Sequence, residues 1–406
     1  MDLLPPEVLN EIFSYCSVVD RVRLRAVNFC LKSAVEWDPL MRGHVPKLVV
    51  TLVDLMSGKV AFARGEEPRA FYQYAGALTC HQKISSVLQW LAASLTQLEV
   101  VVFHPGIGSG SLRHSLFHRQ LVTALDSISR ELSNARQLKG LILRLPVELV
   151  PICPAGRFIA GAERLSFVAL QLQGWGMVRT RGDVSQLLPS KWPASLEELH
   201  LYWKDFRCHV SQQEIDGKPK VVRALLDAIL PWSLRRLELT SFHHILLFQS
   251  VGGRGNHSGC VITLARLEHL TVHKAADCDS FLRLVSLPAL KSLLCTDANP
   301  VLVGWDTAER GRVTRAILGL AELEVLAGFS LAADDDAACA PAWPDDNTPL
   351  TVLWGSGREE KWRPPFRDRR VRVLTTRDAE AAKILEGILL QWDSAPFNGL
   401  LTPVPL

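Results

Sequence analysis

Two groups of residues in this 406-residue chain have types that could do chemistry, and the first is glycine-rich. Residues 106–110 read Gly-Ile-Gly-Ser-Gly and lie between a predicted strand and a predicted helix, the order found in phosphate-binding loops. Their spacing is G-x-G-x-G instead of G-x-G-x-x-G, and no acidic residue ends the next strand. Residues 252–259 are also rich in glycine but lack the Lys-Ser/Thr pair of a P-loop. We interpret both segments as connectors between elements. A nucleotide-binding enzyme is therefore the lowest-ranked of the three functions that we consider for this chain.

The second group consists of four histidines, His243, His244, His257 and His273. They lack the i, i+4 spacing of a helical zinc site and have no fixed cysteine partners. The chain also has no G-x-S-x-G motif for a nucleophilic serine. We therefore interpret these histidines as residues on strand edges, and we expect no metal, no cofactor and no catalysis.

Composition bounds the class of protein. Hydrophobic residues make up 48% of the chain, which is enough for a large core, and the net charge is only +3. This charge argues against a nucleic-acid binder. No uninterrupted apolar segment reaches membrane-spanning length, the first residues do not resemble a secretory signal, and the nine cysteines form no C-x-x-C pair. We expect a protein with reduced thiols that binds no membrane and is cytoplasmic and/or nuclear.

The elements that must position any site begin with three short helices. Pro5-Pro6 suits a helix start, Asp20 can cap a second helix, and Asn28 can begin a third. The first helix carries one apolar stripe formed by Val8, Leu9, Ile12 and Phe13. A unit this small buries little surface by itself, so residues 1–45 are predicted to be an interaction module.

These residues resemble an F-box. The resemblance lies in Leu4-Pro5-x-Glu7-x-Leu9-x-x-Ile12-Phe13-Ser14-Tyr15, followed by Asp20, Arg23, Arg25 and Val27. It implies docking onto a Skp-family adaptor and, through that adaptor, onto a cullin. The positions that the resemblance places against the adaptor are Leu4, Pro5, Leu9, Ile12, Leu24 and Val27. The alternative is a three-helix N-terminal cap that binds nothing.

From residue 95 onward the pattern L-x-x-L-x-L recurs, as in Leu138-Leu141-Leu143 and Leu196-Leu199-Leu201. Its spacing, mostly about 20 to 40 residues, and the helical stretches between its copies predict an α/β array of parallel strands alternating with helices. The predicted helices are 83–93, 116–132, 221–230 and 312–320. This resembles an irregular leucine-rich-repeat solenoid of the kind often fused behind an F-box. The alternative is a non-repetitive α/β domain.

The predicted organisation has four parts. They are the helical module at 1–45, a capping hairpin and helix at 46–95, the repeat region at 96–375, and a capping helix and tail at 376–406. Within them we predict a strand at 47–53 that turns into 60–63, a surface loop at 331–349, and an amphipathic helix at 378–392.

We predict a substrate-recognition subunit of a Skp–cullin–F-box ubiquitin ligase that binds an unknown protein through outward strand positions. The candidate substrate-binding residues, all expected to be exposed, are His200, Tyr202, Arg236, Glu238, Thr271 and His273, with Arg144 and Gln171 as further positions. The basic residues at 361–372 are interpreted as a solvated edge, or else as a grip for an acidic partner. The runner-up function is a non-catalytic scaffold with a ligase-independent F-box.

Overall fold

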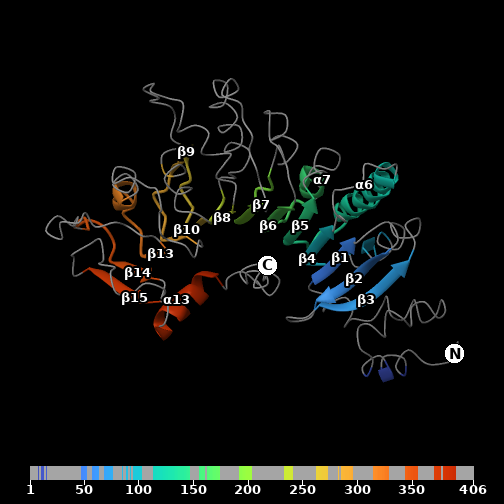
Figure 1. Ribbon diagram of the computed structural model, residues 1–406, viewed down its shortest axis with the longest axis horizontal. Coiled ribbons are helices and arrows are strands. Elements are labelled where there is room, and N and C mark those ends of the chain that lie inside the picture. The colour runs from blue at the N-terminus through green and yellow to red at the C-terminus, as the bar shows by residue number, and fades with distance from the viewer. Residues whose placement is uncertain are drawn as a thin grey trace, which may run out of the picture. The chain divides into compact units, whose positions relative to one another are not determined.

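The structure is a computed structural model, and it falls into two compact units (Figure 1). Unit 1 comprises Met1–Gly176 and Thr180–Leu196, and unit 2 comprises Met177–Arg179 and Glu197–Leu406. The residues that the structure describes are 8, 11–12, 15, 47–52, 57–63, 68–75, 85, 88–89, 92, 95–102, 113–146, 155–160, 162–173, 192–203, 233–240, 262–272, 282, 285–295, 314–328, 343–354, 370–375 and 378–389.

Unit 1 is a mixed sheet with the strand order β3-β2-β1-β4-β5-β6. Its strands are β1 (Lys47–Leu52), β2 (Ser57–Ala63), β3 (Pro68–Ala75), β4 (Gln97–Val102), β5 (Gly140–Pro146) and β6 (Phe167–Gln173). β1, β4, β5 and β6 are parallel, whereas β2 and β3 are antiparallel additions at one end. The predicted hairpin of β1 and β2 is confirmed, and sequence reasoning missed β3.

Two helices of unit 1 lie side by side, α6 (Arg113–Leu132) and α7 (Ala155–Ala160). An ion pair of 2.9 Å joins Arg157 to Asp126, and the Ser129 hydroxyl donates to the Arg157 carbonyl. The predicted helix 116–132 is confirmed, and it begins three residues earlier than expected.

In unit 2 all seven strands of the main sheet are parallel and follow one another in chain order. They are β7 (Glu198–Trp203), β8 (Arg236–Thr240), β10 (His269–Val272), β12 (Ser292–Cys295), β13 (Val325–Ala327), β14 (Leu350–Trp354) and β15 (Val371–Thr375). β9 (Ile262–Thr263) pairs with β11 (Val285–Ser286) in a separate small sheet, and α13 (Ala379–Leu389) follows β15. The predicted α/β class with parallel strands is therefore confirmed.

The strand register places the recurring leucines in rows on one face of the sheet, which we call the leucine face. Leu199, Leu237, Leu270, Leu293 and Leu326 are paired in sequence across β7 to β13, and each is completely buried. Because side chains alternate along a strand, the residues directly before and after each of these leucines in its strand point to the other face. In unit 2 we call that other face the opposite face.

A tight turn precedes most of the parallel strands of the main sheet, and it ends at the first leucine of the L-x-x-L-x-L pattern. The amide of the first leucine of L-x-x-L-x-L donates to the carbonyl three residues earlier, as Leu138 does to Ala135 and Leu196 to Pro193. The next two amides then share one carbonyl of the preceding strand, as Lys291 and Ser292 share that of Glu268. The backbone geometry thus repeats more regularly than the sequence does.

Other expectations have mixed outcomes. Residues 343–349 form neither helix nor strand, and Asp345 and Asp346 are exposed, as the predicted surface loop 331–349 requires. Two of its side chains are nevertheless buried: Trp343 donates from Nε1 to the Thr348 carbonyl, and Asn347 donates to the Leu318 carbonyl. Residues 314–318 are helical, within the predicted helix 312–320. The predicted helix 221–230 and the glycine-rich segments lie outside the described residues. No helix in the described part is long and apolar enough to cross a membrane.

Candidate functional site

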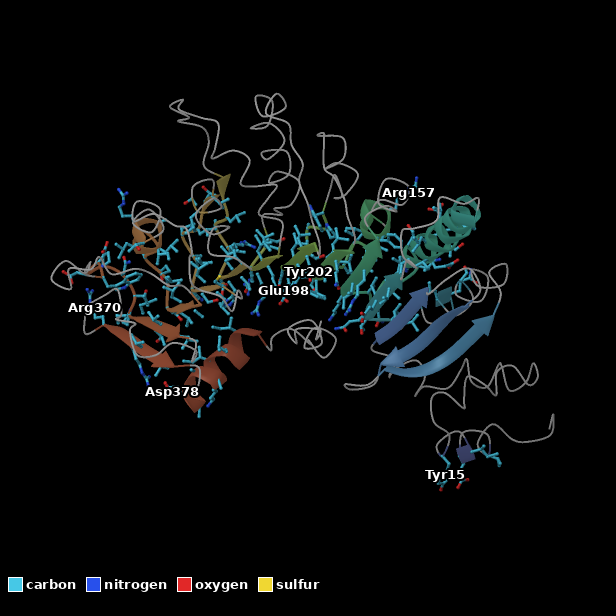
Figure 2. All side chains as sticks on the ribbon, viewed as in Figure 1. Tyr15, Arg157, Glu198, Tyr202, Arg370 and Asp378 are labelled. Carbon is cyan, nitrogen blue, oxygen red and sulfur yellow. The ribbon has the colours of Figure 1, made fainter. Side chains whose placement is uncertain are left out.

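The first candidate surface belongs to the N-terminal module. Residues 8, 11, 12 and 15 are described there, and all four are helical. Val8, Ile12 and Tyr15 are exposed, Tyr15 at 85% (Figure 2). The spacing i, i+4, i+7 puts the three on one face of a helix, which gives an exposed apolar stripe. The other adaptor candidates, Leu4, Pro5, Leu9, Leu24 and Val27, lie outside the described residues.

The second candidate surface is the opposite face of unit 2, which is polar over β7, β8 and β10. The register aligns Glu198, Arg236, His269 and Ser292 in one row and His200, Glu238 and Thr271 in the next. Figure 2 labels Glu198 and Tyr202 on β7. This register agrees with the prediction that Arg236, Glu238 and Thr271 point away from the leucine face.

The expected exposure of these candidates is wrong in part. Arg236 is 4% exposed and His200 is 6% exposed, whereas Tyr202, Glu238 and Thr271 are half-buried. Arg236 reaches the last turn of α13, where its Nη1 donates to the Ile388 carbonyl over 2.5 Å. A helix from the end of the chain therefore covers part of the face that the sequence left open. His273 lies outside the described residues.

Burial sets the electrostatics of the polar rows. It lowers the pKa of His200 although the Glu238 carboxylate, 3.0 Å from His200 Nδ1, acts in the other direction. Burial, helped by the Arg236 charge, lowers the pKa of His269 to about 4. Burial also lowers the pKa of Arg236 and raises that of Glu198. Both histidines are therefore neutral at pH 7.

A serine and a histidine meet in this network, but their placement does not suit nucleophilic catalysis. His269 Nδ1 lies 2.7 Å from Ser292 Oγ, within the reach that an activated serine needs. Ser292 is only 1% exposed, so a substrate in solution has no access to its hydroxyl. The pair instead joins two adjacent strands and satisfies two buried polar groups.

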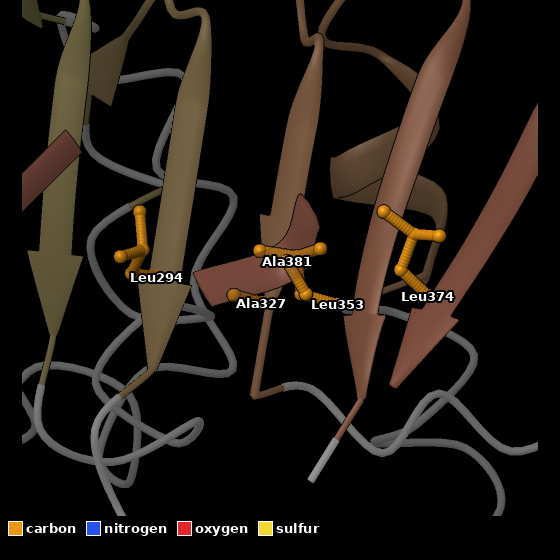
Figure 3. Packing of buried hydrophobic residues seen from close by; sticks show 5 residues of the cluster. All are labelled: Leu294, Ala327, Leu353, Leu374 and Ala381. Atoms are coloured by element: carbon orange, nitrogen blue, oxygen red, sulfur yellow. The ribbon is translucent and has the colours of Figure 1, made fainter. Parts of the chain in front are cut away.

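Towards β15 the opposite face becomes apolar. Leu294, Ala327, Leu353 and Leu374 form a buried cluster with Ala381 of α13 (Figure 3). The half-buried Ile384, Leu385 and Ile388 of the same helix pack against this cluster. The sequence held a signal for it, since Leu293-Leu294, Val352-Leu353 and Val373-Leu374 are apolar on both faces of their strands. Such strands require cover on both sides.

The basic segment 361–372 is represented by two arginines. Arg370 is half-buried, with Nη1 donating to the Pro344 carbonyl, Nη2 to the Trp343 carbonyl, and an ion pair to Asp345 of 3.1 Å. Arg372 forms a bidentate pair with Glu380 of α13, with N–O distances of 2.7 and 2.5 Å. Arg370 is thus held against residues 343–345, which corrects the interpretation of a solvated edge at that position, whereas Arg372 is exposed as that interpretation expects.

In unit 1 two further outward positions are less exposed than expected. Gln171 is 3% exposed, and Arg144 lies 2.9 Å from the buried carboxylate of Glu99. Elsewhere in unit 1 Glu131 accepts from Ser85 and Gln89, both at 2.9 Å, which ties residues 85–89 to α6. Across the described residues, no group of three or more His, Cys, Asp or Glu side chains is arranged to hold a metal ion.

Comparisons with known proteins add one finding at the N-terminal surface. A search of curated proteins found no match to this chain. Residues 1–42 match the F-box domain family, and this range includes the exposed apolar stripe of Val8, Ile12 and Tyr15. The match covers the module that the sequence set apart and stops before β1. The chain therefore carries an F-box domain at residues 1–42.

Proposed function

We propose that this protein is the substrate-recognition subunit of a Skp–cullin–F-box ubiquitin ligase. The observation that carries the proposal is the F-box domain at residues 1–42, whose described apolar side chains are exposed. An exposed apolar stripe on a short helix is the feature that a partner helix or groove buries on binding. The partner would be a Skp-family adaptor, and a cullin would be recruited through that adaptor.

In this role the protein does no bond chemistry. It holds a protein substrate close to a ubiquitin-loaded enzyme, and the rate gain comes from proximity. The part of the chain that follows the F-box domain would supply the substrate-binding surface. The buried Arg236 and His200 are poor candidates for direct contact, so Tyr202, Glu238 and Thr271, which are half-buried, are the strand positions that we retain.

The adaptor contact can be tested in the full-length chain. Replacing Leu9 and Ile12 by Asp places charges in an apolar contact, which costs several kcal/mol for an unpaired charge. We expect this variant to lose co-purification with a Skp-family adaptor at least tenfold. An Asn10→Asp variant is the matched control, because the helical period predicts that position 10 lies away from the stripe. Undiminished adaptor capture by the double variant would refute the proposal.

A second measurement separates the proposed function from the runner-up, a scaffold with a ligase-independent F-box. The full-length protein is captured with its adaptor, and the cullin is measured in the same sample. Recovery of adaptor and cullin together supports the ligase subunit. Recovery of the adaptor alone would favour the scaffold.

A further inference from the structure

The strongest unexplained feature outside the F-box is the cover over the apolar half of the opposite face. We call the residues Leu294, Ala327, Leu353 and Leu374 the strip. They come from four successive parallel strands and are 1–9% exposed. The helix α13 lies over them, with the completely buried Ala381 against the middle of the strip (Figure 3).

The side chains of α13 are less deeply buried than the leucines of the leucine face. Ala381 is the residue of α13 that the strip buries completely, whereas Ile384, Leu385 and Ile388 are only partly buried. A helix of 11 residues is not stable alone in water, so α13 depends on the strip for its structure. Its departure would uncover the strip and leave the leucine face, with Leu293 and Leu326, unchanged.

Two arginines of the sheet contact opposite ends of the helix. Arg372 forms its bidentate pair with Glu380 in the first turn, and Arg236 donates to the Ile388 carbonyl in the last turn. Helix N-termini favour acidic side chains, and helix C-termini leave carbonyls that need donors. The strip therefore selects a helix with an apolar face, and the two arginines fix the direction in which that helix runs and its position along the strip.

We propose that α13 is a displaceable intramolecular occupant of the strip, and that a helical segment of a partner protein binds there in its place. The partner segment is an amphipathic helix with an acidic residue in its first turn, a small residue next to it, and aliphatic residues three, four and seven positions after the small one. This is recognition of a helix in a groove. The proposal does not rest on the F-box function, since the strip and α13 both belong to unit 2.

A short connection between β15 and α13 explains why α13 covers the strip when no partner is present. Val371–Thr375 ends just before α13 begins at Ala379, so the helix is held beside the strip by a few residues. A short linker gives an effective concentration on the order of millimolar, which a partner must exceed. A substitution that weakens only the contacts between α13 and the strip should therefore allow a helix added in solution to bind the strip.

Two adjacent alanines give a matched pair for this test. In the full-length chain, Ala381→Arg places a long charged side chain where a completely buried methyl group lies, whereas Ala382→Arg makes the same change at an exposed position. The probe is a fluorescent peptide with the sequence of residues 377–392. We expect Ala381→Arg to bind it at least tenfold more tightly than the wild type or Ala382→Arg. Amide exchange should speed up in α13 and stay slow in β12 to β14.

A charge swap locates the peptide. Glu380→Lys in the peptide should weaken its binding to the Ala381→Arg chain at least threefold, and adding Arg372→Glu to that chain should restore it. Equal peptide binding by Ala381→Arg and wild type would overturn the proposal. Loss of cooperative unfolding across β7 to β15 in Ala381→Arg would also overturn it, because α13 would then be an inseparable part of the core.

Discussion

The opposite face of unit 2 has a polar half on β7, β8 and β10 and an apolar half on β12 to β15, and the two halves are buried in different ways. In the polar half side chains pair across neighbouring strands, as His200 Nδ1 does with Glu238 and His269 Nδ1 with Ser292. In the apolar half a separate helix covers the side chains. Both halves consist of parallel strands, and one register runs through all of them.

The difference shows what decides where a partner can bind on such a sheet. A buried polar network needs every member in place, because an unpartnered polar group in the interior is costly. An apolar strip needs only a cover of the right shape, and a second helix can supply it. The polar half is therefore the fixed half, although its residue types look more suitable for recognition, and the apolar half is the replaceable one.

The largest expected effect compares two adjacent leucines on the two faces of β12. Leu293→Ala opens a cavity in the leucine face, and such changes cost about 2–5 kcal/mol. Leu294→Ala lies under α13, which can settle into the gap, so we expect about half that loss. The two substitutions are comparable because both leucines are at most 3% exposed. Urea unfolding of both variants measures the two losses in the free energy of unfolding. Equal losses would mean that α13 packs as rigidly as the core.

The next effect compares two adjacent arginines in the polar half. Arg236→Ala removes the donor to the Ile388 carbonyl and the positive charge near Glu198, and a hydrogen bond from a charged group contributes about 1.5–3 kcal/mol. Arg235→Ala changes a side chain that is 60% exposed, so the free energy of unfolding should move by less than about 0.5 kcal/mol. Thermal unfolding checks both. A small effect of Arg236→Ala would restore it as a candidate contact residue.

The sequence predicted the leucine face and its strands because L-x-x-L-x-L records both the turn and the alternation. Leu267, Leu270 and their equivalents occupy the expected positions. The burial of Arg236 was not predictable, because it depends on a contact with Ile388, 152 residues away in the chain. The strip was predictable in principle from consecutive apolar pairs such as Leu293-Leu294. Local patterns thus locate one face well and leave unknown what covers the other.

Acid should weaken the polar half through its histidines. The pKa of His269 is about 4 when folded and about 6.5 when unfolded, so the unfolded state binds more protons between these values and stability falls as the pH drops through them. His200 acts in the same direction. The slope is below about 1.4 kcal/mol per pH unit for each histidine, less for His269 because it is partly exposed.

Urea unfolding between pH 7.5 and 5 measures this slope. The charged groups near His269 are Arg236, Glu268 and Lys291, and Ser292 is hydrogen-bonded to its ring. Glu198 acts against the trend, because its raised pKa lets the folded state hold a proton more readily. His269→Gln should therefore flatten the slope. An unchanged slope in that variant would assign the acid sensitivity to other groups.

The smallest expected effect on stability is that of a substitution at Arg372, which contacts the exposed first turn of α13. Arg372 and Glu380 are both more than half exposed, and exposed ion pairs are screened by salt and contribute little to global stability. The pKa of Arg372 is raised, chiefly by its hydrogen bonds to Glu380, so this guanidinium keeps its charge. We expect Arg372→Ala to leave the urea midpoint unchanged. Amide exchange in the first turn of α13 should nevertheless be faster, and high salt should remove the difference from wild type. Because Arg236 holds the other end of the same helix in a buried setting, a salt-insensitive loss at Arg236 beside a salt-sensitive one at Arg372 would show that α13 is released from its N-terminal end first.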